Sequence, residues 1–232
     1  MHRNQHLIYW VAPLLAIIVL VVTSDSNIPW LQRIIAPEIN REFGLLENLQ
    51  LLVLFFIMVL AWKGFRSRQQ RLEKVGYGLL LLFSIVIFLE EMDYGLHYYE
   101  LLFKDGFTDQ EMIRNIHNQG ENLFYIRQGL YTLLAILFVL LPVVGPMLKY
   151  PLVRYVSANR MIIATMAVYI VTGILARHYH GWVGLPVNPP LWGNHQEFEE
   201  LVVYYMFMLY LWDIVLFRGP IPLGRLASAS DQ

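Results

Sequence analysis

The chain has 232 residues, of which 57% are hydrophobic and 15% charged, and its formal net charge is −1. A soluble domain usually carries about 25% charged residues, so this composition argues against a soluble protein and predicts an integral membrane protein. The sequence contains no Cys, which excludes a disulfide framework, an iron–sulfur cluster and a thiolate nucleophile. It also has no basic run of the kind that binds nucleic acid.

Six apolar blocks follow one another along the chain, and each is expected to form a transmembrane helix, since roughly 20 residues cross the hydrocarbon core. The match of Val22-x-Ser24 to a signal-peptide cleavage site is weak, so the first block is expected to be a retained helix. The sequence predicts an all-α, single-domain bundle over residues 1–217, followed by a short cytoplasmic tail, 218–232. The expected spans are about 7–23, 45–62, 75–99, 126–148, 161–177 and 200–217.

The loops between these blocks differ in charge, and this difference predicts the orientation of the protein. Basic residues crowd the segments before the first block, between the second and third, between the fourth and fifth, and after the sixth. The positive-inside rule places such segments in the cytoplasm. Both termini are therefore expected to be cytoplasmic, in a bacterial inner membrane. The basic residues include Arg3, Lys63, Arg66, Arg68, Arg71, Lys74, Lys149, Arg154, Arg160, Arg218 and Arg225.

Ionisable residues on four of the expected helices lie at a similar depth. Each is 16 to 18 residues from a basic residue at the inner end of its helix, which is about 24–27 Å at 1.5 Å per residue. A charged group inside a membrane is costly, so it usually faces the bundle interior, has a partner and serves a function. This pattern predicts a polar pocket that opens toward the periplasm. The four residues are Glu47, Glu90, Arg177 and Glu200.

Histidines and carboxylates recur one helical turn apart near this layer, as in His117 with Glu121 and His195 with Glu199. Such pairs can share a divalent metal, and imidazole with carboxylate suits zinc, iron, manganese or copper. Glu90, Glu91 and Glu121 are expected to be catalytic, and Arg127 and Arg177 to hold an anionic head group or cofactor. The expected metal ligands are Glu47, His97, His117, His195, Glu199 and Glu200.

The same charged residues have an alternative interpretation as structural ion pairs between helix ends. Known enzyme patterns do not decide the question. Glu90-Glu91 is similar to the paired glutamates of CAAX-type intramembrane proteases, but the Arg that follows the second Glu by four positions in that family is Gly95 here. The sequence contains no Gly-x-Ser-x-Gly elbow, no His-Glu-x-x-His and no phosphate loop.

Three short motifs resemble a poorly characterised bacterial family of polytopic membrane proteins. They are the run from Glu90 to Gly95, the run from Asn115 to Asn118, and the acidic residues from Glu197 to Glu200. A Glu-Glu helix end, an Asn-x-His-Asn loop and an acidic start to a late helix recur in that family. The likeness covers the chain from the third span onward. It implies that these residues belong to one site and names no reaction.

The leading functional hypothesis is a membrane-embedded, metal-dependent enzyme that acts on a lipid or lipid-linked substrate. The alternative is a non-catalytic accessory subunit or assembly factor, whose partners would be other subunits of a larger membrane complex. A transporter or proton relay ranks third, because the inner half of the spans offers only Asp213 as a titratable carboxylate. The lipid bilayer itself is an expected partner in all three cases, and nucleic acid in none.

Overall fold

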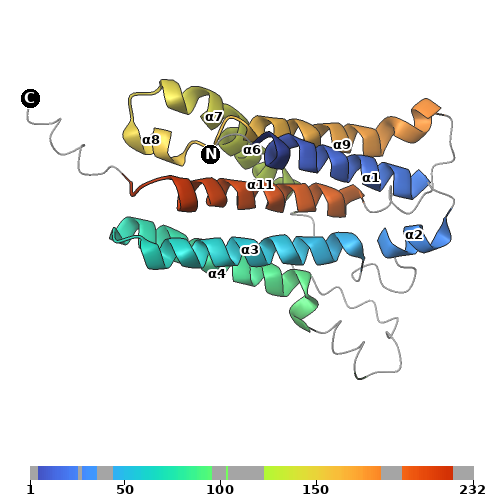
Figure 1. Ribbon diagram of the computed structural model, residues 1–232, viewed down its shortest axis with the longest axis horizontal. Coiled ribbons are helices and arrows are strands. Elements are labelled where there is room, and N and C mark those ends of the chain that lie inside the picture. The colour runs from blue at the N-terminus through green and yellow to red at the C-terminus, as the bar shows by residue number, and fades with distance from the viewer. Residues whose placement is uncertain are drawn as a thin grey trace, which may run out of the picture.

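A computed structural model describes residues 5–25, 28–35, 44–95, 103, 123–183 and 195–221. Within these ranges the regular structure is helical. The long helices lie side by side along the long axis of the molecule (Figure 1). The prediction of an all-α fold is confirmed for this part of the chain.

Each of the six expected spans overlaps a helix or a continuous series of helical segments. The first and fourth spans each contain a π-helical stretch, and the fourth ends in a 3-10 turn. The elements are η1 (Leu7–Val11), α1 (Ala12–Asp25), α2 (Pro29–Ile35), α3 (Leu45–Ser67), α4 (Arg71–Glu91), η3 (Asp93–Gly95), α6 (Leu123–Ala135), η5 (Ile136–Leu140), α7 (Leu141–Val144), η6 (Gly145–Met147), α8 (Pro151–Val156), α9 (Ile162–Val183) and α11 (His195–Phe217).

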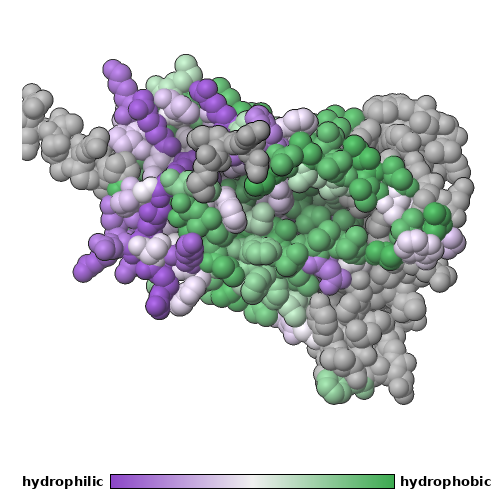
Figure 2. Space-filling model, in the orientation of Figure 1, coloured by the Kyte–Doolittle hydropathy of each residue, from purple (hydrophilic) through white to green (hydrophobic). Residues whose placement is uncertain are grey.

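Four helical segments are long and apolar enough to cross a membrane: Leu45–Ser67, Arg71–Glu91, Gln128–Met147 and Glu197–Phe217. The first and fifth expected spans hold shorter apolar stretches, Leu7–Val19 and Ile162–Ile174. Figure 2 shows hydrophobic residues covering the middle of the molecule, while hydrophilic residues gather at the end that holds α8 and the α3–α4 turn. These features are those of a membrane protein with four candidate spanning helices.

The third span differs from its expected bounds of 75–99. The helix α4 begins four residues earlier, at Arg71, and ends at Glu91. Tyr94 and Gly95 then adopt positive φ angles of 54° and 85°, the left-handed conformation that commonly terminates helices. Glu90 and Glu91 therefore lie in the last turn of α4, and the end of the expected span, residues 96–99, lies outside the described residues.

The helix α11 is central to the packing, since it contacts both α3 and α9. Its residues join two apolar clusters: Met206 packs with α9 and η5, and Ile214 with α3 and α4. Near its C-terminal end, α3 approaches α4 closely at Gly64, where an added Cβ would lie 2.6 Å from the ring of Tyr77. The bundle is thus tightest around α3 and α11.

A proline near the start of the chain requires a compensating contact from α9. Pro13 lacks the N–H group that would bond to the Tyr9 carbonyl in a regular α-helix. The hydroxyl of Thr165, which is fully buried, donates a hydrogen bond to that carbonyl instead. Unpaired backbone groups are costly in an apolar interior, so this contact fixes the first helix against α9.

Replacing Thr165 by Val is expected to lower the free energy of unfolding by about 0.5–1.5 kcal/mol, the usual net value of one intramolecular hydrogen bond. SDS titration of the purified protein in mixed micelles measures this difference. The matched control is Thr132→Val, because the Thr132 hydroxyl is exposed and donates to Gln128 within its own helix. Equal losses in the two variants would contradict the assigned role of Thr165.

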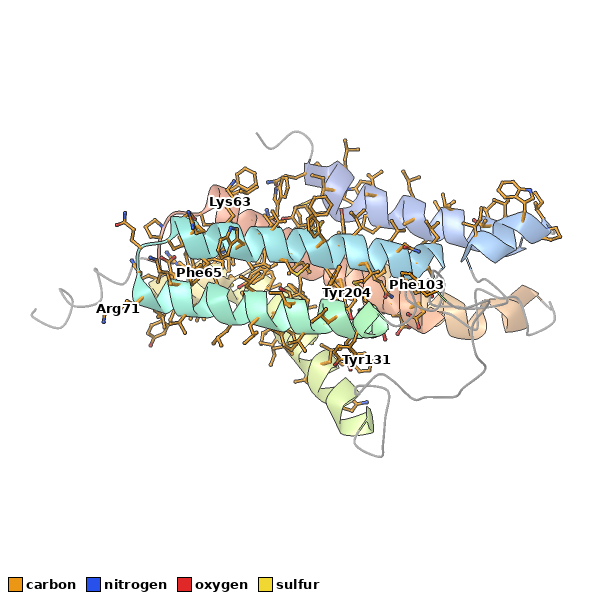
Figure 3. The ribbon with its side chains drawn as sticks, turned by 90° about the horizontal axis from the view of Figure 1, so that it is seen from below. Lys63, Phe65, Arg71, Phe103, Tyr131 and Tyr204 are labelled. Carbon is orange, nitrogen blue, oxygen red and sulfur yellow. The ribbon has the colours of Figure 1, made fainter. Side chains whose placement is uncertain are left out.

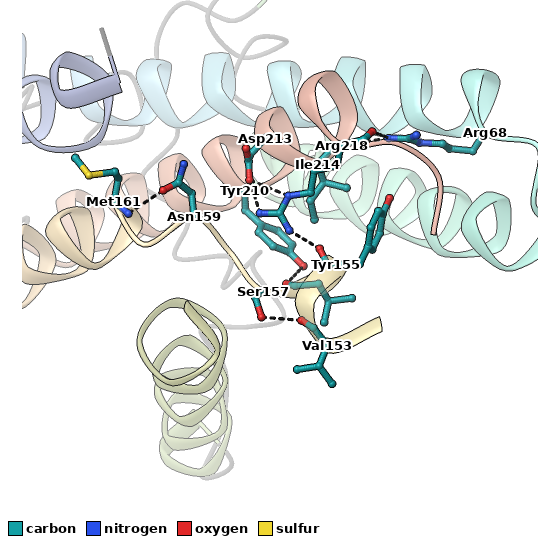
Figure 4. Close-up of polar contacts among 11 residues, drawn as sticks. Arg68, Val153, Tyr155, Ser157, Asn159, Met161, Tyr210, Asp213, Ile214 and Arg218 are labelled. Atoms are coloured by element: carbon teal, nitrogen blue, oxygen red, sulfur yellow. Dashed lines mark hydrogen bonds and ion pairs between the residues drawn. The ribbon is translucent and has the colours of Figure 1, made fainter. Parts of the chain in front are cut away.

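A buried polar cluster joins the α3–α4 turn to the C-terminal end of α11 (Figure 4). The side chain of Arg68 is only 9% exposed, and its Nη2 donates to the carbonyls of Ile214 at 2.8 Å and Arg218 at 2.6 Å. The side chain of Arg218 in turn pairs with Asp213, with Nε 3.0 Å from Oδ2. These contacts satisfy carbonyls that the end of a helix otherwise leaves unpaired.

Glu73 completes this cluster from the first turn of α4. Its side chain is 1% exposed, and its Oε1 accepts hydrogen bonds from the Tyr155 hydroxyl at 3.1 Å and the Ile221 N–H at 3.0 Å. Arg68 Nε lies 3.9 Å from the same oxygen. Burial raises the pKa of Tyr155 above its ordinary value, so this hydroxyl stays protonated and remains a donor. Together these residues hold α3, α4, α8 and α11 in one arrangement.

Candidate functional site

The opposite end of the bundle is acidic. The N-terminal turns of α3 and α11 and the last turn of α4 meet there, and α9 contacts α11 on the side away from α3 (Figure 1). Glutamates come from the N-terminal turns of α3 and α11 and from the last turn of α4. The described glutamates at this end are Glu47, Glu90, Glu91, Glu197, Glu199 and Glu200.

Gln50 connects α3 to α11. Its side chain is fully buried, and its Nε2 donates to the backbone carbonyl of Glu197 at 2.7 Å and to its Oε2 at 3.3 Å. Its Oε1 is buried and accepts no hydrogen bond from the described residues. Glu47, one turn earlier on α3, is only 8% exposed. This side of the site therefore combines carboxylates with an amide oxygen that has acceptor capacity left.

Tyr204 connects α11 to α4. Its hydroxyl donates to Glu91 Oε1 at 2.7 Å, so the side chain points from α11 toward the end of α4 (Figure 3). Glu200 precedes Tyr204 by one helical turn, and both Glu200 and Glu197 also interact electrostatically with the Tyr204 hydroxyl. The hydrogen bond holds the Glu91 carboxylate in a fixed orientation beside the acidic start of α11.

Glu199 faces in a different direction from its neighbours. A Cβ added at Gly173 of α9 would lie 2.9 Å from Glu199 Oε1, so this carboxylate rests against the α9 backbone. Glu197 accepts hydrogen bonds from Gln50 of α3, and Glu200 interacts electrostatically with the Tyr204 hydroxyl that donates to Glu91 of α4. Glu197 and Glu200, three positions apart, share one face of α11, and Glu199 lies on a different face.

Several residues that the sequence predicts for the site fall outside the described structure. They are His97, His117 and Glu121. Arg127, Arg177 and His195 lie on α6, α9 and α11, but only their backbone is described. Among the described side chains, no group of three His, Asp or Glu residues is placed to hold a metal ion. The metal site therefore stays a prediction that depends on those further side chains.

Two polar residues of the site were not predicted from the sequence. Gln50 lies three positions after Glu47, and Tyr204 four positions after Glu200. Both spacings place the second residue on the same helix face as the first. A search for hydrogen-bonding side chains one turn away from each intramembrane glutamate would have found them.

The arrangement combines carboxylates from three helices with a phenol and an amide at the edge of an apolar bundle. Carboxylate and carbonyl oxygens bind divalent cations. A carboxylate that is held by a hydrogen bond can also accept a proton from a water or a substrate hydroxyl. The site is therefore chemically suited to cation binding and to general base catalysis.

The likeness of this chain to known proteins was tested in three ways. No protein-family model, curated protein or solved structure matches it. The resemblance to a bacterial membrane-protein family stays a prediction, and the functional argument depends on the geometry of the acidic end.

Proposed function

We propose that the chain is a membrane-embedded, metal-dependent enzyme that acts on a lipid or lipid-linked substrate. It crosses a bacterial inner membrane six times, with both termini in the cytoplasm and the acidic end toward the periplasm. The observation that supports this best is the meeting of glutamates from α3, α4 and α11, joined by the Gln50–Glu197 and Tyr204–Glu91 hydrogen bonds. Ionisable groups gathered at the edge of apolar helices usually serve a function.

The metal in this proposal is a divalent ion of zinc, iron, manganese or copper. The described carboxylates do not form a three-ligand group by themselves, so histidines must complete the site. Glu47 and Glu200 supply oxygen ligands, and His97, His117, His195 and Glu199 are the further candidates. The free acceptor capacity of the buried Gln50 Oε1 supports a ligand there that carries positive charge or donates a hydrogen bond.

The proposed chemistry is hydrolysis assisted by the metal. A bound ion would lower the pKa of a water and polarise the bond under attack. Glu91, oriented by Tyr204, would accept the proton of the attacking water, and Glu90 and Glu121 are the other candidate acids or bases. Arg127 and Arg177 hold an anionic head group. Oxidation at a centre with two metal ions is the alternative chemistry for the same ligand set.

A lipid substrate fits the position of the site. The acidic cluster lies at the end of the apolar helices, the level at which lipid head groups lie. Leu89, directly before Glu90 and Glu91, is 41% exposed on α4. A head group at the membrane boundary would therefore lie beside the last turn of α4, the turn that carries Glu90 and Glu91.

Elemental analysis of the detergent-purified protein, prepared without chelators, tests the proposal. We expect about one or two metal ions per chain in the wild type and loss of the metal in Glu47→Gln, Glu200→Gln and His117→Ala, which remove proposed ligands. Asp213→Asn is the matched control, because its carboxylate pairs with Arg218 at the basic end and its removal should leave the metal content unchanged. A folded wild type without metal would contradict the metalloenzyme.

An accessory subunit is the second candidate, and the exposure of two spans favours it. In the most apolar 18 residues of each helix, only 17% are buried for Arg71–Glu91 and 22% for Gln128–Met147, against 44% for Leu45–Ser67. Helices with so much open surface are suited to packing against another membrane subunit. A metal-free chain that elutes in a stoichiometric complex with a second membrane protein would favour this function over the enzyme.

A proton relay stays the third candidate. It needs titratable groups between the two ends of the bundle. The two described carboxylates at the basic end are both engaged, Asp213 in an ion pair with Arg218 and Glu73 in hydrogen bonds with Tyr155 and Ile221, which makes them poor members of such a chain.

A further inference from the structure

The basic end of the molecule, defined by the α3–α4 turn, α8 and the C-terminal end of α11, presents only positive charge at its described surface. Its two described acids are turned inward: Glu73 accepts from Tyr155 and Ile221, and Asp213 pairs with Arg218. The exposed charges that remain are Lys63, Arg66, Arg71, Lys74, Lys149, Arg154 and Arg160. A surface of this kind attracts anionic head groups.

Two of these residues lie in the helical turn from which an exposed apolar stripe on α4 begins. Arg71 and Lys74 occupy the first turn of this helix. The stripe starts between them and continues toward the acidic end, with side chains 59–64% exposed. Their spacing of three, four or seven residues keeps them on one helix face. The stripe consists of Leu72, Val75, Leu79, Leu82 and Phe83.

We propose that α4 binds an anionic phospholipid, with the phosphate on Arg71 and Lys74 and one acyl chain along the apolar stripe. The two parts of the site match the two parts of the ligand. The cations select a negative head group, and the stripe provides the length of apolar surface that an acyl chain covers. A free phosphate would use only the first of these features, and a zwitterionic lipid only the second.

The neighbouring contacts make this helix end rigid enough to present a site. Glu73, between the two cations in sequence, is buried and hydrogen-bonded to the chain after α11. Tyr77, one turn later, packs against Gly64 of α3. Because the inward face of the first two turns is fixed, the positions of Arg71 and Lys74 on the outward side are fixed as well. This pre-organisation reduces the entropy lost when a head group binds.

Native mass spectrometry of the detergent-purified chain, titrated with phosphatidylglycerol or with phosphatidylcholine of the same acyl chains, tests the proposal. A basic side chain near an anionic surface contributes roughly fivefold to binding. We therefore expect the wild type to prefer phosphatidylglycerol by about 25-fold at one site. Arg71→Gln with Lys74→Gln should abolish this preference, and each single variant should reduce it about fivefold.

The control variant, Lys63→Gln with Lys149→Gln, removes the same charge from two exposed residues of the basic end outside α4. It should keep the preference. Arg71→Lys with Lys74→Arg should keep it too, and shows whether loss in the Gln variant reflects charge or misfolding. The proposal is overturned by a wild type without preference for the anionic lipid, or by equal losses in the two Gln double variants. Glycerol 3-phosphate, which lacks acyl chains, should not compete at equal concentration.

Discussion

Replacing Arg68 by Ala is expected to lower the free energy of unfolding by about 3–5 kcal/mol, the usual cost of removing one partner of a buried ion pair. The substitution leaves the Glu73 carboxylate, 1% exposed, without its nearest guanidinium. It also leaves the Ile214 and Arg218 carbonyls without the donor that now pairs with them. SDS titration in mixed micelles, followed by far-ultraviolet circular dichroism, measures the loss.

Arg66→Ala is the control for this prediction, since it removes a guanidinium from the same helix end. Arg66 is exposed, and its main described contact is a cation–π interaction 5.6 Å from the ring centroid of Trp62, which contributes about 0.5–1 kcal/mol at exposed sites. The combined variant Arg68→Met with Glu73→Met should recover part of the stability, because replacing both partners by apolar residues is often neutral. Equal losses for Arg68→Ala and Arg66→Ala would show that the buried cluster does not stabilise the bundle.

Replacing Gly64 by Ala is expected to cost about 1–3 kcal/mol, the range for overpacking a close contact. The new methyl group would lie 2.6 Å from two atoms of the Tyr77 ring and 2.8 Å from a third. Tyr77 is itself buried, with 6% exposure, and its ring has little room to move away. The helices α3 and α4 must therefore separate, which also disturbs the turn that carries Arg68 and Glu73.

Gly76→Ala provides the comparison, because a Cβ at Gly76 meets no atom within 4 Å. Both glycines are helical, so both substitutions gain the same improvement in helix propensity, about 1 kcal/mol in water. Gly76→Ala should leave stability unchanged or raise it slightly. A Gly64→Ala protein as stable as Gly76→Ala would show that α3 and α4 are not held at this distance.

The helical architecture was predictable because hydrophobic length is a strong and local signal. Their apolar residues alone were enough to identify the blocks that form α3, α4, the α6–α7 series and α11. The ends of the helices were harder to place. The polar run after Glu90 looked like a continuation of the third span, but the left-handed residues Tyr94 and Gly95 end it. Backbone conformation at a helix end depends on only one or two residues, so composition does not reveal it.

The candidate site was predictable in its level along the helices and not in its contacts. Counting residues from the basic loops put Glu47, Glu90 and Glu200 at one depth, since the rise of a helix is constant. Rotation about each helix axis is not fixed by such a count. The partners Gln50–Glu197 and Tyr204–Glu91 depend on how three helices pack. For the same reason Arg68 and Glu73 looked like ordinary loop charges, although packing buries both.

The helix α11 sets the distance between the two polar ends of the protein. The side chains of Arg68 and Gln70 donate hydrogen bonds to the carbonyls of Arg218 and Ile221. The C-terminal end of α11 therefore cannot shift along α3. The distance from Arg218 to Glu197 is then about 32 Å of uninterrupted helix. The height at which Glu197 meets Gln50, and Tyr204 meets Glu91, is thus set by contacts at the far side of the bundle. Removing the Arg68 or Gln70 side chain should therefore shift the acidic residues along the helix axis without touching them.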